Sequence, residues 1–262
     1  MKISVIGVGA MGGALAQGIL KSNILEKNED LCVYDISSEA LQTFKANGAR
    51  IATTAQEAAQ VSDIVMVVVK PWFVQELLTS IREVLDYKKQ QLIVVAAGIS
   101  STQVEEWLCK DGVLLPFYLT IPNIAIEVLA SMTFLVPFHS TEHQTETVTQ
   151  LFDKMGQTMI VEEHLLGAAT TLASCGIAYA MRYVRASTEG GVEMGFKAQK
   201  AQEIVQQTVL GAVQLLQAKK AHPEELIDKV TTPGGVTIKG LNEMEHAGFT
   251  SAVIRGLKAG MK

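Results

Sequence analysis

Three glycines near the start of the chain have the spacing of a phosphate-binding turn. Gly7, Gly9 and Gly12 follow the apolar run Ile3–Ile6 in the order G-x-G-x-x-G, where a helical pattern begins. The first glycine permits a tight turn, the second lets the backbone approach a pyrophosphate, and the third lets helix and strand pack closely. Free N–H groups at the helix N-terminus would bind the phosphates. The segment predicts a dinucleotide site, and four glycines in seven residues argue against a signal peptide.

An acidic residue at the end of the next apolar run strengthens this prediction. Leu31–Asp35 reads as a second strand that ends in a carboxylate, roughly 20 residues after Gly12. A carboxylate there accepts hydrogen bonds from a ribose 2′-hydroxyl but repels a 2′-phosphate, which requires a nearby Arg. No Arg lies between Leu31 and Ala49. We therefore expect NADH or NADPH as the cofactor, with Asp35 favouring NADH; the alternative is a glycine-rich turn without a ligand.

The composition excludes several other classes of protein. The chain has 262 residues, of which 48% are hydrophobic, enough for two domains. A net charge of -5 without a run of five like charges argues against nucleic acid or a membrane surface as a partner. Cys32, Cys109 and Cys175 form no C-x-x-C pair and suggest no metal site, so we expect reduced thiols in a cytoplasmic protein. The weakly charged stretch Asn123–His139 is broken by Pro137 and too polar to span a bilayer.

Short apolar runs alternate with amphipathic stretches up to residue 161. This alternation is typical of an α/β domain with a doubly wound parallel sheet covered by helices on both faces. The expected strands are Ile3–Ile6, Leu31–Asp35, Ile64–Val69, Leu92–Ala96, Leu114–Leu119 and Met132–Val136. The expected helices follow Gly12, begin at Ser37 or Ser38, at Thr54 and at Thr102, and span Trp72–Asp86 and Thr141–Met155.

Ligands of such a sheet bind beyond the carboxyl ends of the strands. The strand ends should therefore line one crevice that holds the cofactor. Lys70 is expected to contact the cofactor, although it could instead be an ordinary solvated lysine. Asn123 is expected to contact cofactor or substrate, although its side chain could instead form an Asx-turn. The predicted cofactor-binding residues are Gly7, Gly9, Ala10, Met11, Gly12, Asp35, Val69, Lys70, Pro71, Ala97 and Gly98.

From residue 162 onward the pattern is helical. We expect a dinucleotide-binding domain of residues 1–161 and a helical domain of residues 162–262. The stretch Leu165–Ala186 is apolar on more than one side, so a helix there must be buried. One helical domain has too few elements to cover it, so we expect a homodimer or a larger homo-oligomer. A second long helix is expected at Ala198–Lys219, and Thr231–Thr237 should interrupt the helices.

Short motifs recur along nearly the whole chain, namely Gly7-x-Gly9-x-Met11-Gly12, Val69-Lys70-Pro71, Ala96-Ala97-Gly98, Pro122-Asn123, Ser131-Met132-Thr133, Thr231–Thr237 and Ala247–Ile254. Together these motifs resemble those of the pyrroline-5-carboxylate reductase family. The loop around Pro233 is more specific than the glycine fingerprint. The resemblance implies a Rossmann-type domain followed by an all-helical domain that dimerises, with the active site between them. It also implies hydride transfer from NADH or NADPH to the cyclic imine 1-pyrroline-5-carboxylate, which gives L-proline in proline biosynthesis.

The expected chemistry needs positioning more than acid–base groups. A cyclic imine that binds protonated accepts hydride without a strong acid on the protein, and no Ser/His/Asp or Cys/His constellation is evident. We expect Asn123 and Thr237 as catalytic residues. The predicted substrate-binding residues are Asn123, Gly234, Gly235, Val236 and Thr237. Of these, Gly234, Gly235 and Thr237 are expected to hold the substrate carboxylate through backbone N–H groups and a hydroxyl at a helix start. The alternative for this loop is a glycine helix stop without a ligand.

Departures from the family pattern leave the substrate open. Two further hypotheses remain: a related reductase for another imino or keto acid, and a nucleotide-binding regulatory protein without turnover. Glu127, at a position that is usually apolar, would place a negative charge near the pocket and oppose an anionic substrate. Hydroxyls and prolines of the family are replaced at Ile124, Ala125, Ala173, Cys175, Ile177 and Val236.

Overall fold

The structure, a computed structural model, describes residues 1–261. The chain forms two compact units, which divide between Ser174 and Cys175. The domain limits 1–161 and 162–262 stay a prediction.

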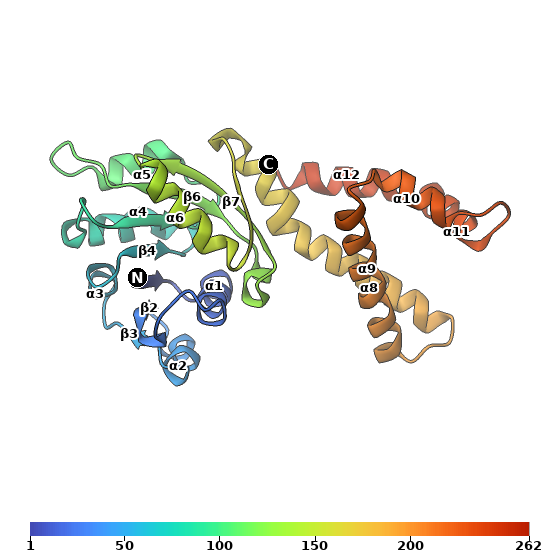
Figure 1. The fold of residues 1–262 in the computed structure, drawn as a ribbon, viewed down its shortest axis with the longest axis horizontal. Helices are drawn as coiled ribbons and strands as arrows, with labels where there is room; N and C mark the ends of the chain where they lie inside the picture. Colours follow the sequence, from blue (N-terminus) through green and yellow to red (C-terminus); the bar gives the residue numbers. More distant parts are fainter. Residues whose placement is uncertain (262) are drawn as a thin grey trace. The chain divides into compact units, whose positions relative to one another are not determined.

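The first unit is built on one eight-stranded sheet with the order β3-β2-β1-β4-β5-β6-β7-β8 (Figure 1). Strands β1 to β6 pair in parallel, as predicted, and β8 pairs in parallel with β7. The strands are β1 (Ile3–Ile6), β2 (Leu31–Tyr34), β3 (Arg50–Ile51), β4 (Ile64–Val67), β5 (Gln91–Val94), β6 (Phe117–Ile121), β7 (Ser131–Phe138) and β8 (Gly156–Ile160).

Strand β7 runs antiparallel to β6, which corrects the prediction of a wholly parallel sheet. Their connection consists of residues 122–130 and contains only the 3₁₀ turn η3 (Ile124–Val128). A parallel neighbour needs a crossover of a dozen or more residues, whereas a shorter link forces a reversal. Strands β3 and β8 were not predicted, because β3 has two residues and β8 is a half-exposed edge strand without an apolar run.

Helices cover both faces of the sheet (Figure 1), and alternate strand residues bury against each layer. Val5 of β1 belongs to an apolar cluster with α1, α2 and α6. Ile6 belongs to the cluster with α3, α4 and α5, which also includes Cys32. Burial raises the pKa of the Cys32 thiol to about 11, as suits a core residue. The helices are α1 (Ala10–Lys21), α2 (Ser38–Ala46), α3 (Ala55–Gln60), α4 (Pro71–Ile81), α5 (Ser101–Leu108) and α6 (Glu142–Asp153).

Most of the predicted helix caps are present. The side chains of Ser37 and Thr54 accept hydrogen bonds from backbone N–H groups of the helices that follow them, as predicted. Thr141, which was expected only as the start of a helix, caps α6 in the same way. The predicted cap at Thr102 is wrong, because Ser100 caps α5 in a box with Gln103. Two overlapping S/T-x-x-E/Q patterns exist here, and the sequence alone does not distinguish between them.

As predicted, helices are the only regular elements of the second unit over residues 175–261. They are α8 (Gly176–Glu193), α9 (Ala198–Lys219), α10 (Pro223–Val230), α11 (Val236–His246) and α12 (Phe249–Ala259). Helix α9 has the predicted bounds. Helix α11 begins inside the stretch Thr231–Thr237, so only the part up to Gly235 interrupts the helices.

The predicted helix Leu165–Ala186 is not uniform. It consists of the 3₁₀ turn η4 (Glu163–Leu165), a short helix α7 (Leu166–Ala169), a π-helical turn η5 (Thr170–Cys175) and the first part of α8. A π turn inserts one residue per turn and is recognised by its hydrogen bonds rather than by composition.

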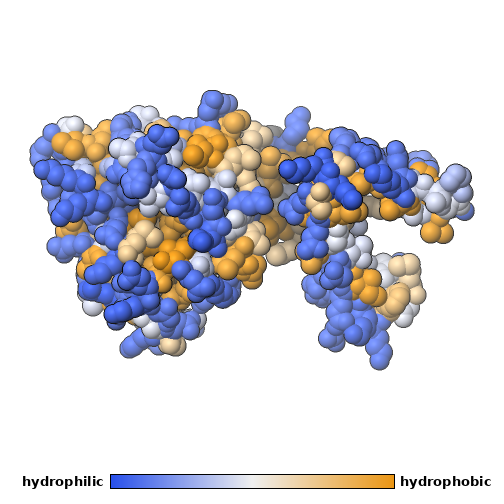
Figure 2. All heavy atoms as spheres, in the orientation of Figure 1, coloured by the Kyte–Doolittle hydropathy of each residue, from blue (hydrophilic) through white to orange (hydrophobic). Residues whose placement is uncertain are grey.

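The helical stretch Glu163–Glu193 leaves much apolar surface uncovered, as predicted. Within the described residues the stretch Glu163–Glu193 is long and apolar enough to cross a membrane by length and composition, and only 11% of its most apolar window is buried. One such helix is weak evidence for a membrane span. Apolar residues are exposed on several elements (Figure 2), among them Met181 and Tyr183 on α8 and Val253 and Ile254 on α12.

Candidate dinucleotide-binding site

The turn after β1 has the geometry that its three glycines predict. Gly7 has a φ of +94°, and an added Cβ would overlap the carbonyl oxygen of Val68. A Cβ on Gly12 would overlap the carbonyl oxygen of Gly7, so this glycine allows α1 to approach the turn. A Cβ on Gly9 would meet nothing within 4 Å. The space over Gly9 is therefore open to a ligand.

The N-terminus of α1 is a ready anion site. Gly9 is the N-cap and makes no side-chain cap. Within residues 1–261, the N–H groups of Ala10, Met11 and Gly12 have no acceptor, whereas that of Gly13 donates to the Gly9 carbonyl. Such free donors at the positive end of a helix bind phosphate oxygens.

Asp35 lies beside this turn at the end of β2. Its Oδ2 accepts a hydrogen bond from the Val8 N–H at 2.7 Å, and its Oδ1 accepts one from the Ser37 N–H at 2.8 Å. Two charge-assisted bonds hold the carboxylate in one orientation, and each oxygen keeps a free lone pair. The predicted ribose acceptor is thus preorganised next to the predicted phosphate site.

The remaining predicted cofactor residues follow β4 and β5 at the same edge of the sheet. Val69 packs against the core, Lys70 is exposed, and Pro71 is the first residue of α4. Ala97 and Gly98 are exposed, and Gly98 has a φ of +78°. Because β1, β2, β4 and β5 are parallel neighbours, the structure brings these residues to one edge. Their contact with a cofactor stays a prediction.

Asn123 follows β6 at this edge and is 4% exposed. Its Oδ1 accepts a hydrogen bond from the Ala125 N–H at 3.0 Å, which is the Asx-turn alternative. Its backbone N–H donates to Ser131 Oγ at 3.2 Å, a support that sequence reasoning missed although Ser131 belongs to a matching motif. The side-chain Nδ2 has no acceptor among residues 1–261 and remains a donor for a ligand.

Glu127 lies away from the glycine turn. Lys21, the last residue of α1, donates from Nζ to the Glu127 carbonyl at 3.0 Å, and the Glu127 carboxylate lies 3.9 Å from the same Nζ. The cofactor phosphates are expected at the first residues of α1. The effect of the Glu127 charge on an anionic substrate stays a prediction.

The loop before α11 differs in one respect from the prediction. The Gly235 N–H donates to the Thr232 carbonyl at 2.9 Å and is not free for a ligand. Gly234, with a φ of +70°, and Pro233 form the turn that this bond closes. Within the described residues, the N–H groups of Val236, Thr237 and Ile238 have no acceptor, and the Thr237 side chain is exposed. Of the four predicted loop residues, only Gly235 has its N–H taken within the described part of the chain, and the binding of a carboxylate by the others stays a prediction.

The residues that depart from the family pattern lie mainly in two irregular turns. Ile124 and Ala125 belong to η3, and Ala173 and Cys175 belong to the π-helical turn. Ile177 is in α8 and Val236 is the first residue of α11, where it is 84% exposed.

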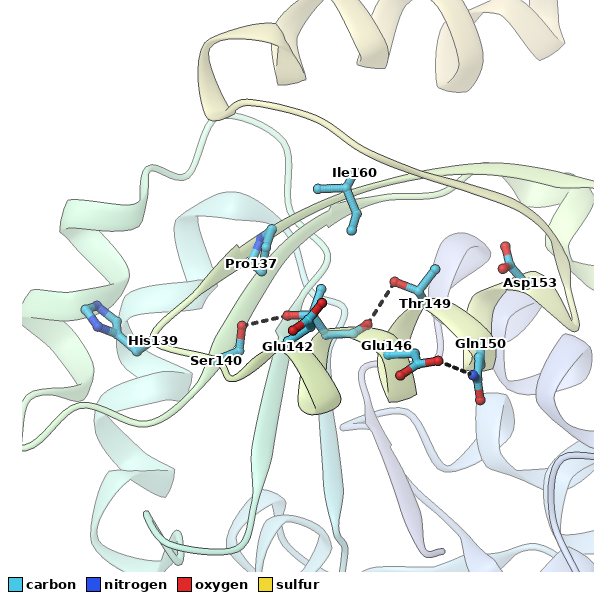
Figure 3. A pocket seen from close by; sticks show the side chains of 10 residues that line it. Pro137, His139, Ser140, Glu142, Glu146, Thr149, Gln150, Asp153 and Ile160 are labelled. Atoms are coloured by element: carbon cyan, nitrogen blue, oxygen red, sulfur yellow. Dashed lines mark hydrogen bonds between the residues drawn. The ribbon is translucent and has the colours of Figure 1, made fainter.

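A separate groove of about 720 Å³ runs along α6 (Figure 3). It is lined by Glu142, Glu146 and Asp153 of α6 together with Pro137 of β7 and Ile160 of β8. None of the predicted cofactor or substrate residues lines it. The groove is therefore not part of the candidate site.

A mostly parallel sheet with an open glycine turn, an uncapped helix and a fixed carboxylate after its second strand is typical of a dinucleotide-binding domain. In agreement, residues 2–111 match the NAD binding domain of 6-phosphogluconate dehydrogenase. Residues 163–262 match the family described as pyrroline-5-carboxylate reductase dimerisation.

Relatives over the full length identify the family. Pyrroline-5-carboxylate reductase 2 of Dictyostelium discoideum is 33% identical over 97% of this chain and 89% of its own length. The Arabidopsis thaliana enzyme is 30% identical over 100% of this chain and 93% of its own. Pyrroline-5-carboxylate reductase 1 of Dictyostelium discoideum is 35% identical, but the chain spans only 48% of its length. The chain belongs to the pyrroline-5-carboxylate reductase family.

Solved structures agree with this assignment. The Plasmodium falciparum pyrroline carboxylate reductase, solved with NADP bound, has a TM-score of 0.90, 25% identity and coverage of 100% of this chain and 95% of its own. The Streptococcus pyogenes enzyme has a TM-score of 0.86, 31% identity and coverage of 100% and 96%. The predicted family, fold class, reductase function and nicotinamide cofactor are thereby confirmed.

Proposed function

We propose that the chain transfers hydride from NADH to 1-pyrroline-5-carboxylate and yields L-proline in the cytoplasm. The similarity to reductases of this substrate over the whole chain carries the proposal. The open Gly9 turn and the uncapped start of α11 support it, because they offer one anion site for a pyrophosphate and one for a carboxylate.

The residues of the chain act mainly by binding and orientation. The nicotinamide supplies the hydride when it is bound. The N–H groups of Ala10–Gly12 hold the pyrophosphate, and Asp35 accepts from the adenosine ribose. Thr237 and the N–H groups at the start of α11 hold the substrate carboxylate, and Asn123 Nδ2 donates to cofactor or substrate. A protonated imine needs no further acid, so alignment of the two reactants lowers the barrier.

Two measurements on the purified chain test this function. NADH fluorescence is titrated with protein, and NADH absorbance is then followed after addition of 1-pyrroline-5-carboxylate. We expect saturable binding and an absorbance decay that depends on the imine. Binding without decay would favour the regulatory hypothesis, and faster decay with a larger imino or keto acid would favour the related reductase.

The fixed carboxylate of Asp35 predicts a preference for NADH over NADPH. Loss of a hydrogen bond to a charged acceptor costs about 1.5–3 kcal/mol, so Asp35→Ala should lower kcat/KM with NADH roughly tenfold to hundredfold. Asp35→Asn keeps an oxygen for the Val8 N–H but removes the charge. It should therefore bring the ratio of kcat/KM with NADH to kcat/KM with NADPH closer to one. Equal or better efficiency of the parent with NADPH would contradict the preference.

The uncovered helix Glu163–Glu193 predicts a homodimer or a larger homo-oligomer. The dimerisation family matched by residues 163–262 supports this proposal. Light scattering at micromolar concentration, without detergent, should give at least twice the mass of 28.3 kDa. A stable soluble monomer would contradict the oligomer, and a requirement for detergent would favour a membrane span.

A further inference from the structure

The loop between β5 and α5 carries free donors next to the cofactor edge. Val95 N–H donates to the Val67 carbonyl, and Ser100 N–H donates to Gln103. Among residues 1–261 the N–H groups of Ala96 through Ile99 have no acceptor. Ala96 and Ile99 pack partly on the core, whereas Ala97 and Gly98 are exposed. The loop therefore offers free N–H groups to a ligand. Its conformation depends on the contacts that hold its two ends.

The second end of this loop is held by a residue far along the chain. Glu163 accepts a hydrogen bond from the Ser101 N–H at 2.7 Å through Oε1 and one from the Ser101 hydroxyl at 2.7 Å through Oε2. Both residues belong to the first compact unit. Val161 and Leu166, which flank Glu163, pack against the same apolar cluster as Ile99. Glu163 is therefore held in place itself and can serve as an anchor.

This contact is more than a helix cap. Ser100 and Gln103 already form a capping box at the start of α5, which satisfies the Gln103 N–H. The carboxylate of Glu163 adds a favourable charge at the helix N-terminus, but its two bonds also join residues 62 positions apart. Such a bidentate link fixes where the first turn of α5 sits relative to the sheet.

The position of the loop indicates which part of the cofactor it serves. The adenosine half of a dinucleotide binds on the side of β2, where Asp35 lies, and the other half binds beyond β4 and β5. We propose, on the basis of the function proposed above, that Glu163 is a positioning residue for the nicotinamide half of the cofactor. Its carboxylate holds Ser101 and thereby aims the free N–H groups of Ala96–Ile99 at the nicotinamide end.

Binding of two ligands by variants at this position tests the inference. NADH contains the nicotinamide, whereas ADP-ribose lacks it and keeps the adenosine and pyrophosphate. Glu163→Ala should raise the Kd for NADH about threefold or more and lower kcat roughly tenfold to hundredfold, because small misplacements of a reacting group are costly. The Kd for ADP-ribose should not change. Glu163→Gln should recover part of the loss, since its amide oxygen still accepts from Ser101.

Two further variants separate positioning from folding. Glu162→Ala is the matched control, because Glu162 carries the neighbouring carboxylate and its side chain is 82% exposed and pairs with His164 rather than with Ser101. This variant should leave both Kd values and kcat unchanged. Ser101→Ala removes one of the two bonds, so it should have a smaller effect that is not additive with Glu163→Ala. If Glu163→Ala does not fold, Ser101→Ala still tests the inference.

Two results would overturn the inference. One is an equal loss of NADH and ADP-ribose binding in Glu163→Ala, which is the signature of a structural defect. The other is unchanged binding of both ligands with unchanged kcat. A parent protein that binds NADH but does not reduce the imine would refute only the proposed substrate, because the ratio of the two Kd values is measured without substrate.

Discussion

Thr237→Val is expected to lower kcat/KM for the cyclic imine about tenfold to hundredfold. The Thr237 hydroxyl is exposed in the first turn of α11, beside backbone N–H groups that have no acceptor in the described part of the chain. Loss of one hydrogen bond to a carboxylate costs roughly 1.5–3 kcal/mol. NADH binding should stay unchanged, because the glycine turn belongs to the other compact unit. Steady-state kinetics and proline binding measure the two effects.

Thr237→Ser is the matched control, since it keeps the hydroxyl and should retain most of the activity. Gly235→Ala is a poorer test. Gly235 has an ordinary φ of -67°, but an added Cβ would lie 2.5 Å from Thr232 Oγ1 and crowd the turn rather than the anion. If Thr237→Val reduces the imine and binds proline as well as the parent, the carboxylate is held elsewhere. The assignment of this substrate would then lose its support.

Gly9→Ala and Gly12→Ala should both abolish most NADH binding, but with different effects on stability. At Gly9 the added methyl group meets only open space and the φ of -65° suits any residue, so the protein should fold normally. The methyl group would occupy the space that the pyrophosphate needs, and we expect an affinity loss of roughly a hundredfold. NADH fluorescence titration measures this loss.

At Gly12 the added methyl group overlaps the Gly7 carbonyl, so α1 must shift. Overpacking costs about 1–3 kcal/mol, which corresponds to a Tm lowered by several degrees in a protein of this size. Gly13→Ala is a useful control, since its methyl group would lie 3.2 Å from the Val8 carbonyl oxygen and needs only a small adjustment. Normal NADH binding by Gly9→Ala would contradict the proposed pyrophosphate site.

Local patterns predicted much of the first unit because its strands are buried on both faces. Strands β1 and β4 have no exposed residue, so they appear in the sequence as continuous apolar runs. In edge strand β8, three of the five residues are exposed and the other two are half-buried, so the strand left no such signal. Strand β7 reverses its direction because its connection to β6 is too short for a crossover. The apolar runs alone indicate only the parallel order.

The sequence indicated which residues could donate hydrogen bonds to a ligand, but not which of their N–H groups are free. The sequence indicated that the loop before α11 supplies backbone N–H groups, but it did not reveal that the Gly235 N–H closes the turn to Thr232. The same applies to Asn123, whose Oδ1 is taken by the Ala125 N–H while Nδ2 remains available. A donor is free only after all local acceptors have been placed, which requires backbone geometry.

The sequence by itself determined the features that arise within a few residues. The spacing of Gly7, Gly9 and Gly12 after an apolar strand specifies a tight turn into a closely packed helix, because the conformations of a tight turn are open to glycine and few other residues. Tertiary structure alone decided the contacts between distant segments. Asp35 holds the Val8 N–H, Glu163 holds Ser101, and Glu127 lies beside Lys21. Such contacts form only when the whole sheet and its helices bring the partners together, since no local propensity encodes a partner tens of residues away.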